Sequence, residues 1–191
     1  MTDFSVAAFA TFIDSMRTHY GKQLPEQDHW KGVRDLLKIL CADQGMRELS
    51  RRWEAKVGRE YILHHDPEYD FFVGALVREP NHKAGIHDHG PTWTIYGVLD
   101  GTEMTHIYDR IDDGGKPGFA EIRLRGKYEA PTGHVDIVPP HVPHAEWGVS
   151  DWSVAITVRT TKPGSYDQVM FHGESGRTSI SRGLELVALD V

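Results

Sequence analysis

The chain has 191 residues and a formal net charge of −7 at pH 7, with 21 lysines and arginines against 28 acidic residues. This length suits one domain with a sizeable core, and the acidic balance excludes a general nucleic-acid binder. The single cysteine, Cys41, excludes an internal disulfide and a cysteine-rich zinc site. No apolar run approaches the ~18 residues of a membrane-spanning helix, and the first residues lack the pattern of a signal peptide. We therefore expect a cytoplasmic protein that binds neither nucleic acid nor membrane.

The first 57 residues predict three helices. Apolar residues recur at intervals of three and four between Phe4 and Met16, then from Pro25 to Leu40, and a short helix is expected from Met46 to Trp53. We expect these helices, residues 1–57, to pack on the rest of the chain through one apolar stripe.

After Gly58 the apolar period falls from about 3.6 to two, which is typical of strands. Gly, Pro, Asn and Asp clusters separate the strands, and many short strands at regular spacing favour a closed barrel or a double-sheet jelly roll. The fold class is therefore mainly β, with residues 58–191 forming one structural unit with the helices. The predicted strands are Glu60–His64, Phe71–Arg78, Thr92–Leu99, Glu103–Asp109, Phe119–Leu124, Gly126–Ala130, Val135–Pro139, Ala145–Gly148 and Trp152–Thr160, with edge strands at Gln168–Phe171 and Leu184–Leu189.

Histidine is the unusual component, because nine of the twelve histidines lie between His64 and His144. His87 and His89 are two residues apart, so on an extended chain both imidazoles project from one face and can reach one metal ion. A third ligand must come from another strand. His144 follows a proline-rich turn and precedes the last long strand, which makes it the best candidate.

Both histidine stretches resemble the two motifs of the cupin superfamily, over roughly residues 58–161. The first motif is His-x-His, usually a Glu, then Gly; the second is Gly, five residues, then Pro-x-Gly-x-x-His. The resemblance implies the cupin double-stranded β-helix, a jelly-roll barrel, behind an N-terminal helical segment. The matching positions are His87, His89, Gly101, Gly133, Pro139 and His144.

Four positions depart from these motifs. Thr94 stands where the first motif has Glu, and His141 stands at a Gly position of the second. Asn81 replaces the usual leading Gly of the first motif, and Gly148 stands at the late Asn of the second. A threonine hydroxyl is a poor metal ligand beside histidines. We therefore predict a site of three histidines. Such a site keeps the full charge of a divalent ion and leaves positions open for an anionic bidentate substrate with dioxygen or water.

The stretch from Gly85 to Gly101 is similar to the cysteine dioxygenase branch of the cupins, whose members oxidise a thiol to a sulfinic acid with Fe(II) and dioxygen. The substrate-binding positions of that branch differ here. Its crosslinking cysteine would fall near Thr94, its Ser-x-His-x-Tyr relay would fall on residues 155–159, and its carboxylate-binding arginine would fall near Tyr61, two residues from Arg59. The prediction is a cysteine-dioxygenase-like Fe(II) enzyme that acts with O2 on a small thiol or another chelating anion.

Two other classes of function stay open from the sequence. One is a non-oxidative isomerase or lyase that uses Zn, Ni or Mn, because imidazole ligands suit several of these metals. The other is a non-catalytic metal- or ligand-binding protein. A buried polar pocket with Arg and Tyr favours catalysis, whereas a pocket closed by Trp93 and Trp147 favours binding alone. A homodimer that shares strands is a further possibility.

Three residues are candidates for catalysis. Arg159 can bind an anionic substrate if its strand face points inward, or lie on the barrel surface. Tyr96 can line the cavity or serve as core packing. His141 can act as an acid or base near the metal, or lie exposed in its turn.

Two further residues are candidates for a role at the metal site. Glu146 can orient a ligand imidazole through its second nitrogen or form a salt bridge at a strand edge. His106 can supply a fourth ligand if it faces the interior.

Overall fold

The computed structural model describes residues 4–80 and 83–189, and it begins with the expected helical segment. In α2 the buried side chains recur at three- and four-residue intervals, which forms the single apolar stripe of a helix packed on a core. The third helix begins earlier than predicted because Asp43 caps it, accepting a hydrogen bond of 2.7 Å from the backbone N–H of Met46. The helices are α1 (Phe4–Tyr20), α2 (Glu26–Ala42) and α3 (Gln44–Ser50).

Two six-stranded sheets make up the rest of the described chain, and the mainly β, jelly-roll fold class is confirmed. The first sheet, sheet A, has the strand order β12-β1-β2-β9-β4-β7 and the second, sheet B, has the order β11-β10-β3-β8-β5-β6. Sheet A consists of β1 (Arg59–His65), β2 (Phe72–Arg78), β4 (Thr94–Asp100), β7 (Val135–Val138), β9 (Ser153–Arg159) and β12 (Glu185–Ala188). Sheet B consists of β3 (Ile86–His87), β5 (Thr102–Arg110), β6 (Ile122–Pro131), β8 (His144–Gly148), β10 (Gln168–Phe171) and β11 (Thr178–Ser181), and the 3-10 helix η1 (Gly173–Ser175) precedes β11.

The strands differ from the sequence expectation at three places. Residues 119–130 were expected to form two strands, but they form the single strand β6, which accommodates a register shift against β5 between Ile107 and Tyr108. The two-residue strand β3 and the strand β11 were not predicted, because neither has a readable apolar alternation. Both are held by backbone pairing with β10.

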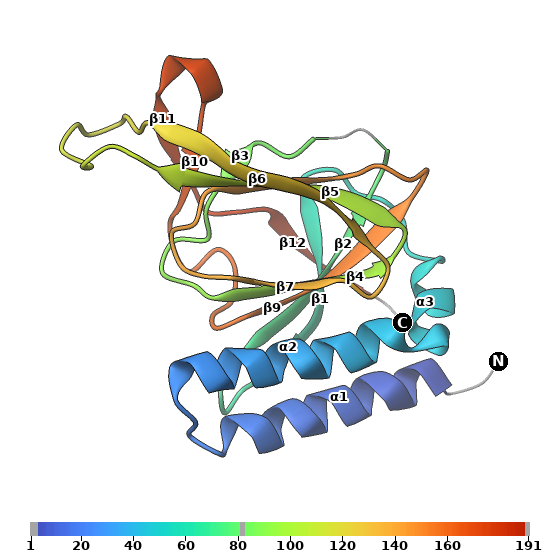
Figure 1. The fold of residues 1–191 in the computed structure, drawn as a ribbon. Coiled ribbons are helices and arrows are strands. Elements are labelled where there is room, and N and C mark those ends of the chain that lie inside the picture. Colours follow the sequence, from blue (N-terminus) through green and yellow to red (C-terminus); the bar gives the residue numbers. More distant parts are fainter. Residues whose placement is uncertain (1–3, 81–82, 190–191) are drawn as a thin grey trace.

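The three helices cover only one face of the molecule, the outer face of sheet A (Figure 1). Leu37 and Cys41 of α2 lie directly over Gly97 of β4, where a Cβ atom would stand 2.8 Å from the cysteine sulfur. This contact needs glycine for the close approach of helix and strand. In the described chain no α-helix covers the outer face of sheet B (Figure 1). Within the described residues, no helix is both long and apolar enough to cross a membrane.

Candidate metal centre

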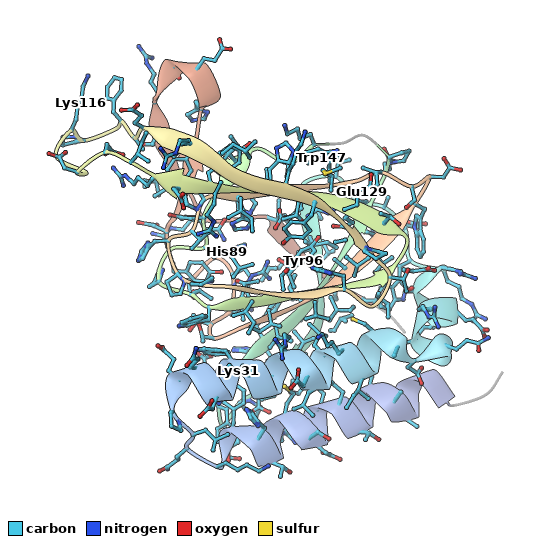
Figure 2. The ribbon with its side chains drawn as sticks, viewed as in Figure 1. Lys31, His89, Tyr96, Lys116, Glu129 and Trp147 are labelled. Carbon is cyan, nitrogen blue, oxygen red and sulfur yellow. The ribbon has the colours of Figure 1, made fainter. Side chains whose placement is uncertain are left out.

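Three histidines and one glutamate meet between the two sheets. His87 of β3 lies opposite His144 of β8 in the antiparallel register, and His89 follows two residues after His87. One ring nitrogen from each histidine and one carboxylate oxygen of Glu146 all lie within 4.8 Å of one another. The Nε2 atoms of His89 and His144 are 3.0 Å apart. His89 and Tyr96 lie between the sheets in Figure 2.

Backbone carbonyls fix two of the three imidazoles. Nδ1 of His87 is 2.9 Å from the oxygen of Gly85, and Nδ1 of His144 is 2.7 Å from the oxygen of Val142. A carbonyl oxygen only accepts hydrogen bonds, so each Nδ1 carries a proton, and Nε2 is the nitrogen of each ring that is left to bind a metal. This is the arrangement that supporting partners give to metal-binding histidines.

Asp88, between the two histidines, holds the loop that carries them. Its Oδ1 accepts hydrogen bonds from the backbone N–H groups of Gly90 (3.0 Å) and Val169 (2.8 Å), so the loop is fastened to β10. Gly90 has a φ of +52°, and a Cβ atom there would lie 2.2 Å from the oxygen of Asp167. A side chain at Gly90 would therefore push the histidine loop away from β10.

The electrostatics of the cluster suit a cation. Burial lowers the pKa of His87 to about 4 and that of His89 well below its usual value, with a further contribution from neighbouring positive groups, so both rings are neutral at pH 7. Burial opposes the ionisation of both His144 and Glu146. Their mutual attraction overrides it, raising the pKa of His144 and holding that of Glu146 well below its usual range. Neutral imidazoles and an ionised carboxylate are the protonation states that metal binding requires, and a divalent ion would displace the proton of His144.

Glu146 lies beside the three histidines predicted from the sequence and could add a fourth ligand to their site. It was considered as a partner for the second nitrogen of a ligand imidazole, but Val142 occupies Nδ1 of His144, and Oε1 of Glu146 lies 3.2 Å from Nε2. The carboxylate therefore faces the same space as the three histidines. The signal in the sequence was the spacing His144-Ala145-Glu146, which places both side chains on one face of β8. Thr94, in the usual Glu position of the motif, is buried and its hydroxyl has no partner among the described residues.

A cavity of about 290 Å³ adjoins the cluster and is lined by His87, His89 and Glu146. Of the three candidate catalytic residues, the structure brings Arg159 and Tyr96 to this cavity. His141 adopts a φ of +60° in its turn, and its side chain is 68% exposed at 4.0 Å from the carboxylate of Asp88. The structure thus leaves His141 at the surface.

Arg159 is 4% exposed and faces inward from β9. One terminal nitrogen, Nη1, donates to Glu60 and to the hydroxyl of Thr157, while Nε is buried without a hydrogen-bond partner in the described chain. Arg59 lies at the cavity mouth, where it is exposed and paired with Glu185 at 2.9 Å. Arg159, and not Arg59, is therefore the arginine that is buried inside the barrel.

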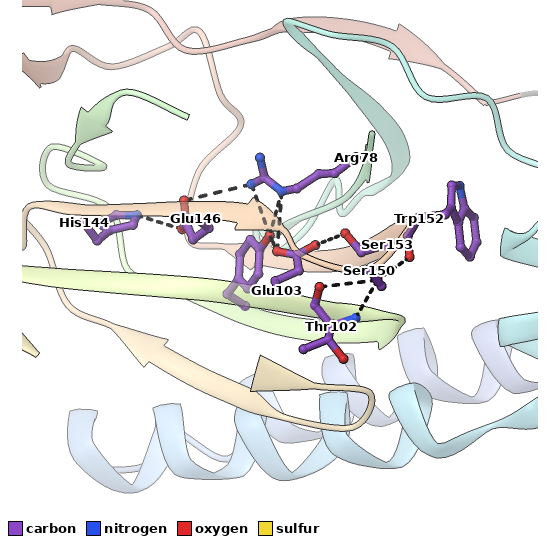
Figure 3. Close-up of polar contacts among 9 residues, drawn as sticks. Arg78, Thr102, Glu103, His144, Glu146, Ser150, Trp152 and Ser153 are labelled. Atoms are coloured by element: carbon purple, nitrogen blue, oxygen red, sulfur yellow. Dashed lines mark hydrogen bonds and ion pairs between the residues drawn. The ribbon is translucent and has the colours of Figure 1, made fainter. Parts of the chain in front are cut away.

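Arg78 was not identified from the sequence. It ends β2, whose continuous apolar run gives no indication of which face is inward. Its guanidinium donates to the hydroxyl of Tyr96 at 3.1 Å and lies 4.0 Å from Glu146. Tyr96 in turn donates to Glu103 at 2.5 Å. Figure 3 shows this network running from Ser153 to the metal cluster.

The remaining candidates point away from the cluster. His106 and Trp147 pack against each other on the outer face of sheet B, with ring centroids 4.7 Å apart. Trp93 stacks on Trp30 of α2 at 5.5 Å and donates to Glu26. Neither Trp93 nor Trp147 lines the cavity beside the cluster.

No family model and no curated protein matches this sequence. Among solved structures, TT1209 from Thermus thermophilus is 13% identical, with 60% of this chain and 95% of that chain covered and a TM-score of 0.44. The coconut allergen cocosin is 17% identical over 48% of this chain, with a TM-score of 0.38, and the 11S globulin from Wrightia tinctoria is 12% identical over 48%, with a TM-score of 0.40. The aligned part spans only 22% of cocosin and 21% of the 11S globulin.

Proposed function

We propose that this chain is a cupin metalloenzyme of the cysteine-dioxygenase type, which uses Fe(II) and dioxygen to oxidise a small chelating anion, a thiol among them. The observation that carries the proposal is the buried cluster of His87, His89, His144 and Glu146 at the wall of a cavity. The proposed metal ligands are these four side chains. A cytoplasmic location and a homodimer remain predictions from the sequence.

The donor set fits a divalent transition metal. Imidazole and carboxylate together suit Fe, Zn, Ni and Mn, and the carbonyls of Gly85 and Val142 hold two rings in the tautomer that a metal needs. Fe(II) held here would supply the activation of dioxygen. The chain itself supplies an orienting charge, because Glu60 and Thr157 hold Arg159 where it can pair with an anionic group of the substrate.

A catalytic role is favoured over binding alone by the composition of the cavity. Arg159 and Tyr96 line it, and the two tryptophans that could have closed it lie elsewhere. The second candidate is a non-oxidative isomerase or lyase with Zn, Ni or Mn, since Glu146 adds an oxygen ligand that these ions also accept.

Metal analysis of protein purified without added metal is the first test. The apoprotein is then loaded anaerobically with Fe(II), and oxygen uptake is followed with small thiols, diketones and hydroxy acids. We expect one bound metal ion per chain and uptake with at least one class of anion. The His144→Ala variant should lose uptake, and the matched variant His106→Ala, on the outer face, should keep it. Tight zinc occupancy with no uptake for any compound would overturn the oxidative proposal in favour of the second candidate.

A further inference from the structure

Lysines and arginines outnumber glutamates in the lining of the cavity beside the metal cluster. Its lining contains five lysines or arginines and three glutamates, whereas the whole chain has a net charge of −7. The ammonium groups of Lys83 and Lys56 lie 4.6 Å and 5.5 Å from the ring centroids of Trp147 and Tyr61, whose rings face away from the space between the sheets. The positive charges inside the barrel are therefore those of Arg78 and Arg159. A buried guanidinium with unused N–H donors attracts a ligand of the opposite charge. The ligand expected in this cavity is therefore an anion.

Two arginines approach the cavity from opposite ends of one ladder. In the antiparallel pairing of β2 with β9, Arg159 lies opposite Phe72 at one end and Arg78 lies opposite Ser153 at the other. Six residues of strand separate the two positions, which is about 20 Å along the ladder. Both arginines line the cavity that adjoins the metal cluster, and Nη2 of Arg78 lies 4.0 Å from the carboxylate of Glu146.

Each guanidinium keeps donors that the protein does not use. Glu60 and Thr157 engage only Nη1 of Arg159, and its buried Nε has no partner in the described part of the chain. Arg78 uses Nε and Nη2 for Tyr96, and its Nη1 makes no hydrogen bond to a described residue. An arginine offers five N–H donors in a planar fork that matches a carboxylate.

The partners of each arginine hold it in place without filling that fork. Tyr96 and Glu103 fix Arg78 from one side, and Ser153 donates to Glu103 at 2.9 Å (Figure 3). A guanidinium fixed before the ligand arrives loses little conformational freedom on binding. A cavity of about 290 Å³ admits a small molecule that reaches both ends.

From these observations we infer that the substrate is a dianion, a dicarboxylate or an equivalent, with one acidic group bound by Arg159 and the other by Arg78 in the cavity beside the metal cluster. The inference rests on the proposed function, which it deepens by naming the class of substrate. Arg78 thereby sets specificity for dianions, because a substrate with a single acidic group leaves the N–H donors of the Arg78 guanidinium unpaired.

Isothermal titration calorimetry of the whole chain tests the inference. The ligands are the saturated dicarboxylates from succinate to pimelate, and each is compared with its monoamide. The monoamide has nearly the same shape and lacks one charge. For at least one chain length, we expect the dicarboxylate to bind tenfold or more tightly than its monoamide. Arg78→Gln should remove that preference and leave the affinity for the monoamide within about twofold. The control Arg34→Gln, on α2, should keep the preference.

The same titrations are run on metal-free protein in EDTA and on zinc-loaded protein, so that the two proposals fail separately. A preference for the dianion in a chain that binds no metal supports the inference and overturns the proposed function. Metal binding with less than threefold preference at every chain length overturns the inference and leaves the proposed function. If Arg78→Gln does not fold, the affinities of the native chain for the dicarboxylate and its monoamide still test whether the ligand is a dianion. Arg78→Lys, which keeps the charge, should then keep part of the preference.

Discussion

The two faces of sheet A are built from the same strands and have opposite character. On the helix side, Ile95 of β4 and Ile156 and Val158 of β9 are fully buried in the main apolar core. On the barrel side, the alternate residues of those strands include Thr94, Tyr96, Thr157 and Arg159, all of them buried and polar. The side chains on both faces are buried, but only those on the helix side contribute the full hydrophobic free energy to stability.

This difference shows how one sheet separates stability from function. The apolar face stabilises the fold by close packing against α2 and α3. Most groups of the polar face are paired or face the cavity, although the hydroxyl of Thr94 has no partner among the described residues. This face contributes less to stability, because burying polar groups is costly. Substitutions on the two faces should therefore affect different measurements.

The largest expected effect is on the helix side. Leu37 of α2 is fully buried against β4. Leu37→Ala should lower the free energy of unfolding by about 2–5 kcal/mol, because it removes apolar contacts and leaves a cavity. Denaturant unfolding measures this loss, and metal affinity should stay the same. A fall in metal affinity of tenfold or more in the folded variant would show that the two faces are coupled.

His144→Ala is the corresponding change on the barrel side. It removes the side chain that links His89 and Glu146 in the cluster. We expect metal affinity to fall by more than the 10–100-fold typical of losing a supporting partner. Competition with a chelator of known affinity measures this change. Unchanged metal occupancy would show that the third ligand is another residue.

Glu146→Gln distinguishes a four-ligand site from a site of three histidines. The change keeps the size of the side chain and removes its charge. If the carboxylate binds the metal, affinity should fall by roughly 10–100-fold, whereas the exposed control Glu129→Gln should have no effect. Equal metal affinity in both variants would support the three-histidine site predicted from the sequence.

Asp66 provides a smaller, pH-dependent test of the connection between the helices and sheet A. Burial opposes the ionisation of this carboxyl, but the hydrogen bond from Arg17 (2.6 Å) and two backbone N–H groups hold its pKa far below the usual value. Because the folded-state pKa is depressed, the stabilisation is complete above the unfolded pKa of about 4 and is lost as the pH falls toward the folded value.

Asp66→Asn should cost about 1–3 kcal/mol at pH 7, and this cost should shrink below pH 4. Urea unfolding of both proteins between pH 2.5 and 7 measures the difference. A cost that is independent of pH would mean that the ion pair with Arg17 contributes little.

The smallest effect concerns Cys41 of α2, whose side chain is fully buried. Burial raises the pKa of its thiol to about 12, so the reactive thiolate is nearly absent at neutral pH. We expect no labelling of the native protein by a maleimide at pH 7 and complete labelling in denaturant. Rapid labelling of the native protein would show that the packing of α2 on β4 opens readily.

The sequence by itself determined the helical segment, most of the strands and the three histidines, because each depends on local spacing. The period of 3.6 in residues 4–50 specifies helices with one apolar stripe, and the pair His87 and His89 places two imidazoles on one face of the chain. Only the tertiary structure decided that Glu146 joins them and that Arg78 faces the cavity. Because successive side chains of a strand point to opposite faces, the sequence separates the two faces but does not show which one is inside. The register of β3 on β8 and of β2 on β9 settles that choice through contacts between residues far apart in the chain.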